Sequence, residues 1–245
     1  MITTELCAYT RAACDVARRC GVSRIELCSA PLEGGTTPSA ALLRYARSLG
    51  GVRLSVMIRP RGGDFLYTDD EVELMAAEIR FARECGADGV VLGLLTADGE
   101  VDVERTTCLV REAGPLEVTF HRAFDMVRDP QRALEALIAC GCRRVLTSGG
   151  RNTALEGIEQ LRALVARAAG RIEVMAGSGV NASNARLLAA TGVDALHFSA
   201  RRSRESAMRY RNPAVSMGGC ADVPEYVVTD ADEELVRQIL TQLEP

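Results

Sequence analysis

The chain has 245 residues, of which 47% are hydrophobic and 25% charged, a composition typical of a globular domain with one large core. It has no run of about eighteen apolar residues, so we expect no membrane span and no membrane partner. A net charge of −4 without a basic block argues against a nucleic-acid partner.

The cysteines and the first residues indicate a cellular compartment. There are nine cysteines, an odd number, and no two of them have the CxxC spacing. The opening sequence MITTELCAYTRAAC lacks a basic segment followed by an apolar stretch and a cleavage site. Reduced thiols are therefore favoured over a disulfide framework, and we expect a cytoplasmic protein.

Glycines divide the chain into a regular repeat of amphipathic segments, each followed by a short apolar run. Glycine ends helices because it adopts the left-handed conformation at little steric cost. The repeat glycines are Gly21, Gly50, Gly86, Gly114, Gly141, Gly170 and Gly192. After an opening strand in ITTELC, the apolar runs predict strands at 25–28, 54–58, 89–93, 118–120, 144–147, 172–176 and 195–198. Their nearly continuous hydrophobicity is typical of parallel strands covered by helices.

Eight strand–helix units predict an α/β fold, a single-domain (β/α)8 TIM-type barrel over residues 1–245. An open doubly wound sheet is the alternative, but the first strand is not followed by GxGxxG. Pro38–Ser39 and Asp129–Pro130 are typical helix starts. Residues 208–230 are predicted to be irregular, and a closing helix is expected at 232–240.

Polar residues gather where the strands end, the face on which such barrels carry their sites. Glycine-rich turns follow the sixth and seventh strands, and such turns can bind an anion through backbone N–H groups. The predicted anion-binding residues are Arg59, Arg61, Arg122, Ser148, Gly149, Gly177, Ser178, Gly179 and Arg201. Alternatively, the glycines only permit tight turns and the arginines pair with Glu26, Asp64 or Asp125.

Acid–base catalysis would require a histidine and a carboxylate that meet at this face. His121 and Asp125 suit that role if they approach one another, because a carboxylate can orient an imidazole and raise its pKa. Glu26, at the end of the second strand, is a third candidate. No nucleophile elbow and no HExxH motif is present, so whether the protein is an enzyme stays open.

The tripeptide Glu-Leu-Cys closes both the first and the second strand, at 5–7 and 26–28. Alternation along a strand places each glutamate and its cysteine on one face. Cys7 and Cys28 are therefore candidates for a metal pair, and two thiolates suit Cu(I) better than Mg²⁺ or Ca²⁺. Barrel shear can instead hold the two sulfurs at different heights, and two buried cysteines that merely close strands are an equally good interpretation.

Five segments resemble one known family: IELCSAPLEGGTTPS at 25–39, VMIRPRGGDFLYTDDE at 56–71, GPLEVTFHRAFDM at 114–126, RVLTSGG at 144–150 and VMAGSGV at 174–180. They are similar to the CutC family over nearly the whole chain. The resemblance implies a (β/α)8 barrel that assembles as a homo-oligomer, dimer or tetramer, and is linked to copper homeostasis in the cytoplasm. It also implies that Cys7 and Cys28 are the metal candidates.

Two functions follow from these patterns. The first is a cytosolic protein of copper homeostasis that binds Cu(I) through its strand-end cysteines. The alternative is a TIM-barrel enzyme that acts on a small phosphorylated or carboxylated metabolite. The many polar strand ends, more than two metal ligands require, favour the alternative, whereas the resemblance favours copper.

Overall fold

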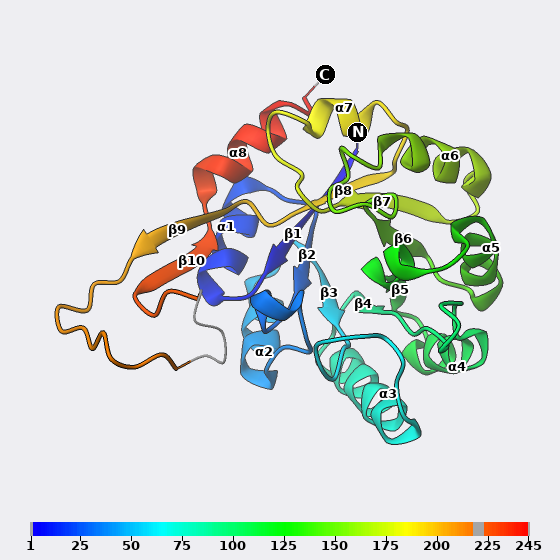
Figure 1. Ribbon diagram of the computed structural model, residues 1–245, viewed down its shortest axis with the longest axis horizontal. Helices are drawn as coiled ribbons and strands as arrows, with labels where there is room; N and C mark the ends of the chain where they lie inside the picture. The colour runs from blue at the N-terminus through cyan, green and yellow to red at the C-terminus, as the bar shows by residue number, and fades with distance from the viewer. Residues whose placement is uncertain (1, 218–222, 245) are drawn as a thin grey trace.

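The barrel is closed by eight parallel strands in chain order, with β8 paired to β1 (Figure 1). The computed structural model describes residues 2–217 and 223–244. The strands are β1 (Thr3–Ala8), β2 (Arg24–Leu27), β3 (Arg53–Met57), β4 (Gly89–Leu92), β5 (Glu117–Phe120), β6 (Arg144–Thr147), β7 (Glu173–Gly177) and β8 (Ala195–Phe198). The eight predicted strands and the (β/α)8 architecture are thereby confirmed.

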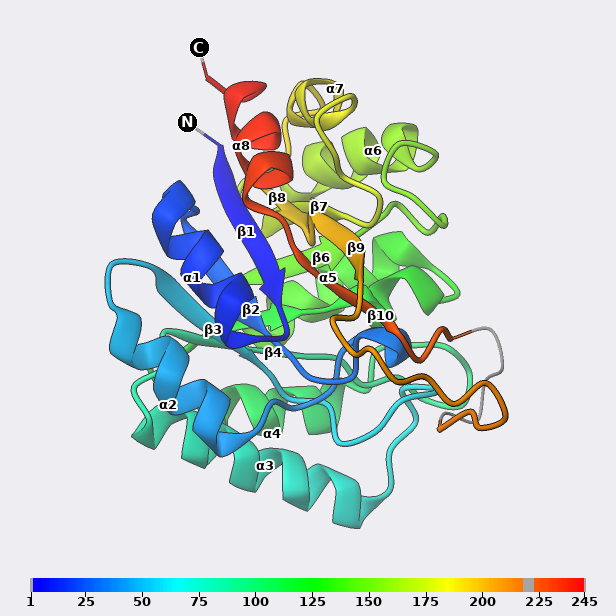
Figure 2. The same ribbon diagram turned by 90° about the vertical axis from the view of Figure 1, so that its left-hand side faces the viewer.

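Helices surround the barrel and cover its outer face (Figure 1, Figure 2). They are α1 (Arg11–Cys20), α2 (Ala40–Leu49), α3 (Asp69–Glu84), α4 (Val103–Ala113), α5 (Pro130–Cys140), α6 (Ile158–Ala168), α7 (Ala185–Ala189) and α8 (Glu233–Thr241), with the 3-10 turns η1 (Pro31–Glu33) and η2 (Arg122–Met126). In the described part of the chain, no helix combines the length and apolar character that crossing a membrane requires.

Local sequence explains where several helices begin. The hydroxyl of Ser39 caps α2, and Asp129 caps α5 ahead of a proline in the first turn, which confirms both predicted helix starts. Thr68 and Glu71 form a reciprocal capping box at the start of α3. Each cap satisfies backbone N–H groups that have no partner within the helix.

The end of the chain is more regular than predicted. Within the segment 208–230, Val227–Ala231 forms β10, which pairs antiparallel with β9 (Arg201–Glu205) as a ribbon that extends from the barrel (Figure 1). The prediction was wrong there because β9 is polar throughout, and the two valines of β10 are adjacent and so lack the alternation of a half-buried strand. Residues 218–222 lie outside the described residues.

The predicted closing helix is present as α8, capped by Asp232. It packs against α1, where Arg19 forms an ion pair with Glu233 at 2.9 Å. The ribbon is held to α1, because the hydroxyl of Thr10, the N-cap residue of α1, donates to Asp230 of β10 at 2.8 Å. These contacts leave the carboxyl ends of β1, β2 and β8 together at one side of the barrel mouth.

Candidate metal centre and adjoining cavity

Strand register brings the first part of the site together. Cys7 of β1 lies opposite Glu26 of β2, and Glu5 lies opposite His197 of β8. All four side chains are wholly or largely buried, with exposed fractions of 6% for Cys7 and 2% for Glu26. Side chains two residues apart on one strand share a face, so Glu5 and Cys7 both contribute to the interior of the barrel.

The two sulfurs meet, as the hypothesis of a metal pair requires. Cys7 Sγ and Cys28 Sγ are 3.9 Å apart, and Glu26 Oε2 lies 3.2 Å from the first and 3.4 Å from the second. The register of β1 and β2 places Cys7 opposite Glu26 and so staggers the two cysteines along the strands, but their sulfur atoms still approach one another. Both cysteines also pack with Met57 and Val91 in one apolar cluster at the mouth.

His197 is oriented by a carboxylate from the neighbouring strand. Its Nδ1 lies 2.7 Å from Glu5 Oε1, while its Nε2 is 3.7 Å from Glu26 Oε2. Glu5 is in turn ion-paired with the buried Arg24. One ligand atom each from Cys7, Glu26 and His197 all lie within 4.8 Å of one another. The Glu5 contact leaves Nε2 as the ring nitrogen available to a ligand.

Burial and neighbouring charges set the ionisation of this cluster. Burial alone raises the pKa of Glu5, but Arg24 and His197 outweigh it and bring the value down to about 2. The hydrogen bond from Cys28, with further contributions from His197, holds the pKa of Cys7 well below 9 despite burial. Cys7 is therefore the anionic member of the sulfur pair.

The pKa values of the other three groups are all raised, which favours their protonated forms. Burial raises the pKa of Cys28 well above 9, and the Cys7 contact adds to the effect. The pKa of Glu26 also rises, mainly through burial. For His197 burial lowers the pKa, but the surrounding Glu26, Cys7 and Glu5 reverse the sign and raise it well above 6.5. The metal-free cluster thus pairs a Cys7 thiolate with a His197 imidazolium.

A cavity of about 290 Å³ opens beside this cluster at the carboxyl ends of the strands. Cys7, Glu26 and His197 form one wall, and Arg59 and His121 belong to the remainder. The full lining is Cys7, Tyr9, Glu26, Glu33, Gly34, Met57, Arg59, Phe65, His121, Arg122, Asp125, Met126, Leu146 and His197. Six of the fourteen predicted site residues therefore line one small chamber, namely Cys7, Glu26, Arg59, His121, Arg122 and Asp125.

His121 does not form the predicted pair with Asp125. Its Nδ1 accepts a hydrogen bond from the backbone N–H of Ala123 at 3.1 Å, and its Nε2 has no hydrogen-bond partner among the described residues. Burial, and secondarily the charge of Arg59, lowers the pKa of His121 to about 3. The ring is therefore neutral with its proton on Nε2, and not a carboxylate-activated base.

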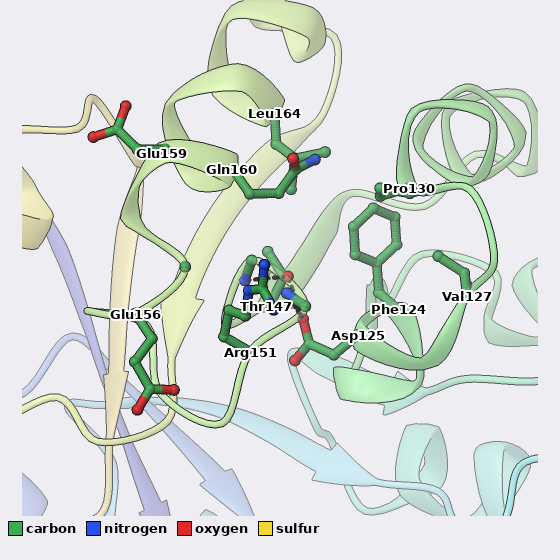
Figure 3. Close-up of a pocket in the computed structure, with 13 residues that line it drawn as sticks. Phe124, Asp125, Val127, Pro130, Thr147, Arg151, Glu156, Glu159, Gln160 and Leu164 are labelled. Atoms are coloured by element: carbon green, nitrogen blue, oxygen red, sulfur yellow. Dashed lines mark hydrogen bonds between the residues drawn. The ribbon is translucent and has the colours of Figure 1, made fainter.

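Asp125 instead binds the glycine-rich turn after β6 (Figure 3). Its carboxylate accepts from the Thr147 hydroxyl at 2.5 Å and from the backbone N–H groups of Ser148 and Gly150, both at 3.0 Å. Arg122 Nε also donates to it at 2.7 Å. Gly149 donates to the Thr147 hydroxyl. The prediction that this turn binds an external anion is therefore wrong, because the Asp125 carboxylate already accepts hydrogen bonds from its donors.

Replacing Asp125 with asparagine is expected to lower the free energy of unfolding by about 2–3 kcal/mol, because buried donors of the turn lose a charged acceptor. Urea unfolding of the variant measures the change. Asp98→Asn is the matched control, since Asp98 forms only an exposed ion pair with Arg128. A loss no greater than that of the control would show that Asp125 does not stabilise the turn.

A second and larger cavity, of about 490 Å³, lies on the other side of this turn (Figure 3). Gly149, Arg151 and the first residues of α6 line it, together with the carboxylates of Glu156 and Glu159. The described residues that line it include no buried polar group without a partner. The smaller chamber is therefore the better candidate site.

The remaining predicted anion-binding residues lie outside the smaller chamber. Arg61 forms ion pairs with Glu71 and Asp64, as expected from the alternative in which the arginines pair with carboxylates of the protein. Arg201 is exposed and lies over the ring of Tyr9. The turn Gly177, Ser178 and Gly179 closes on the neighbouring loop, where the Ser178 hydroxyl donates to Asn152 O at 2.6 Å.

Comparison with known proteins identifies the family. The CutC family model matches residues 2–202. A protein named as CutC from Bacteroides thetaiotaomicron is 51% identical over 224 residues, covering 91% of this chain and 90% of that protein. The chain belongs to the CutC family. A human relative, named copper homeostasis protein cutC homolog, is 47% identical over 236 residues, covering 96% of this chain and 86% of its own.

A solved CutC structure has the same architecture. The copper homeostasis protein CutC of Streptococcus agalactiae superposes with a TM-score of 0.77 at 37% identity, covering 80% of this chain and 98% of that one. Copper homeostasis is thus what the names of CutC relatives record.

Sequence reasoning missed two residues of the cluster at the ends of β1, β2 and β8. His197 and Glu5 were not among the predicted ligands or their supports, although His197 is one of only two histidines and follows a predicted strand. Glu5 belongs to the same Glu-Leu-Cys tripeptide as Cys7. The missing information was the register of β8 against β1, which places residue 197 opposite residue 5.

Proposed function

We propose that this protein binds Cu(I) as its cargo in copper homeostasis, through Cys7, Cys28 and the Nε2 atom of His197. The observation that carries the proposal is the pair of buried sulfurs 3.9 Å apart, beside an imidazole whose other nitrogen is held by Glu5 at 2.7 Å. Thiolates and imidazole are soft or intermediate donors that suit Cu(I). A carboxylate behind a ligating histidine is the usual device that fixes its orientation.

The sulfur separation favours three ligands over two. A metal–thiolate bond is about 2.3 Å long, so two sulfurs in line with the ion would be about 4.6 Å apart. At 3.9 Å the ion would sit off the line between Cys7 and Cys28, with a third position open to His197. Glu26, kept protonated by burial, then contributes a neutral hydrogen bond to the thiolates.

The same proposal includes a cytoplasmic location and a homo-oligomeric state. The eight cysteines of the described residues are all free, which accords with a reducing cytoplasm. The expected homo-oligomer, dimer or tetramer, stays a prediction that the solution mass of the purified protein tests. None of the three ligands depends on a second subunit, since all come from β1, β2 and β8 or the residue next to them.

Cu(I) affinity is expected to rise steeply with pH. In the metal-free protein Cys28 and His197 are protonated, because both pKa values are raised, whereas Cys7 is already a thiolate. Three-ligand binding therefore releases two protons, and affinity should increase by about a hundredfold per pH unit near neutrality. Anaerobic titration against a chromophoric Cu(I) chelator between about pH 6 and pH 8 measures the slope.

His197→Gln provides the matched variant for this titration. It removes one ligand and one released proton, so its affinity should rise by only about tenfold per pH unit. Absence of tight one-to-one binding in the native protein would contradict the proposal. An identical slope in the native protein and the variant would remove His197 from the ligand set.

A further inference from the structure

Cys7, Glu26 and His197 make up only part of the lining of the 290 Å³ chamber, which also includes two residues with buried donors that lack partners. His121 Nε2 and Arg59 Nε each lack a hydrogen-bond partner among the described residues. Both residues are only 5% exposed and both line the chamber. Buried polar groups in folded proteins nearly always have a partner, so two unpartnered donors in one chamber point to a ligand.

Both donor side chains contact one aromatic ring. The guanidinium carbon of Arg59 is 5.0 Å from the centre of the Phe65 ring, and the ring of His121 is also 5.0 Å from it, centre to centre. Neither donor is free to turn away. Arg59 is fixed by the backbone carbonyls of Glu33, Gly35 and Gly63, and His121 by the Ala123 N–H.

Arg59 is a buried cation that forms no salt bridge among the described residues, although the Glu33 side chain also lines the chamber. Arg122 forms an ion pair with Asp125, and His197 contacts Glu5. Arg59 donates only to neutral carbonyls, and within the described residues no carboxylate forms a salt bridge with it. A buried charge of this kind is stabilised by an opposite charge nearby, which favours a single negative charge in the chamber.

We propose that this chamber binds a small organic monocarboxylate, whose two oxygens accept hydrogen bonds from His121 Nε2 and Arg59 Nε. Two donors at fixed positions match the two oxygens of a carboxylate. A phosphate dianion would bring a second charge and a third oxygen, for which Arg59 and His121 have no further unpartnered nitrogen among the described residues. Met57, Phe65 and Leu146 offer apolar contact to the rest of the molecule. The volume is that of about ten waters, which limits the ligand to a few carbon atoms.

The neutral state of His121 makes this donor independent of pH over the physiological range. Its pKa of about 3 keeps the ring uncharged, and the Ala123 N–H on Nδ1 fixes the proton on Nε2. A neutral imidazole N–H held in this way donates a hydrogen bond without exchanging its proton with the ligand. The ligand is therefore recognised as a carboxylate and is not protonated by His121.

The test uses the full-length, metal-free protein under reducing conditions, with acetate and pyruvate as probes, acetamide as the uncharged analogue and inorganic phosphate as the other anion. The readout is the ¹⁵N resonance of His121 Nε2, assigned by comparison with His197→Gln, since the chain has only two histidines. We expect saturable shifts with the carboxylates, and weaker or no shifts with acetamide and phosphate. Carboxylates that leave the resonance unmoved would overturn the proposal, and phosphate binding more tightly than either would overturn the assignment of the ligand class.

Variants of His121 separate binding from folding. His121→Phe keeps the ring and removes the donor, so carboxylate affinity, measured by calorimetry, should fall by about ten- to a hundredfold. His121→Gln returns an N–H donor and should recover part of the loss, while thermal unfolding checks that both variants fold. Equal affinity in the native protein and His121→Phe would also refute the site. Carboxylate binding that persists in Cys7→Ser/Cys28→Ser would show that this site does not depend on copper.

Discussion

Replacing Cys7 and Cys28 together with serine is expected to weaken Cu(I) binding by at least about a thousandfold. Structural metal sites with four ligands release about 10–16 kcal/mol on binding, so loss of two thiolates removes several kcal/mol. Serine keeps the shape of cysteine but offers a hard, protonated oxygen that Cu(I) binds poorly. The measurement is anaerobic competition with a chromophoric chelator at one fixed pH.

The control for this experiment is another cysteine of the same chain. Cys108 is exposed on α4, far in sequence from the strand ends, and Cys108→Ser should leave the affinity unchanged. Circular dichroism of the double variant verifies that the barrel is folded, because both side chains are buried. Tight one-to-one binding that survives the double substitution would exclude Cys7 and Cys28 as the ligands.

Glu5→Gln is expected to lower the free energy of unfolding by about 3–5 kcal/mol, the largest stability effect in the barrel interior. The substitution leaves Arg24 as a buried charge without its partner, and breaking a buried ion pair in this way is strongly destabilising. It also removes the carboxylate that contacts Nδ1 of His197. Urea unfolding measures the loss, and Glu159→Gln, which breaks only an exposed pair with Arg162, is the control.

A second variant separates the ion pair from general disruption of the core. In Glu5→Gln/Arg24→Met the unpartnered charge is removed, so the double variant should be more stable than Glu5→Gln alone. If the double variant is instead less stable by the sum of two independent losses, the ion pair is not what couples these residues.

The same pair predicts how stability depends on acid. The pKa of Glu5 falls from 4.5 to about 2 on folding, because Arg24 and His197 outweigh the effect of burial. A lowered pKa contributes stability that is fully present above pH 4.5 and is lost as the pH falls toward 2. The contribution is about 3 kcal/mol. Glu5→Gln should therefore lose less stability than the native protein across this range.

The repeat of the barrel could be predicted from the sequence because it depends on local patterns. Each parallel strand is a continuous apolar run, and each helix ends near a glycine or begins at a capping residue such as Ser39 or Asp129. The ribbon of β9 and β10 was missed because β9 is polar, β10 lacks apolar alternation, and their pairing joins residues about 25 positions apart.

The site was predictable only in part, for a physical reason. That Cys7 shares a face with Glu5 follows from alternation along one strand, which the sequence displays. The contacts that decide the chemistry join distant residues, as between His197 and Glu5 or between Asp125 and the turn at Ser148. A glycine-rich turn has the same sequence whether it binds a ligand or a carboxylate of its own chain.

The most direct test of the copper site is X-ray absorption at the copper edge on the Cu(I)-loaded protein. We expect two sulfur donors at about 2.3 Å and one nitrogen donor at about 2.0 Å, lengths typical of metal–thiolate and metal–imidazole bonds. The nitrogen should disappear in His197→Gln and one sulfur in Cys28→Ser. A coordination shell of oxygen and nitrogen alone, or one unchanged by either substitution, would contradict a site built from Cys7, Cys28 and His197.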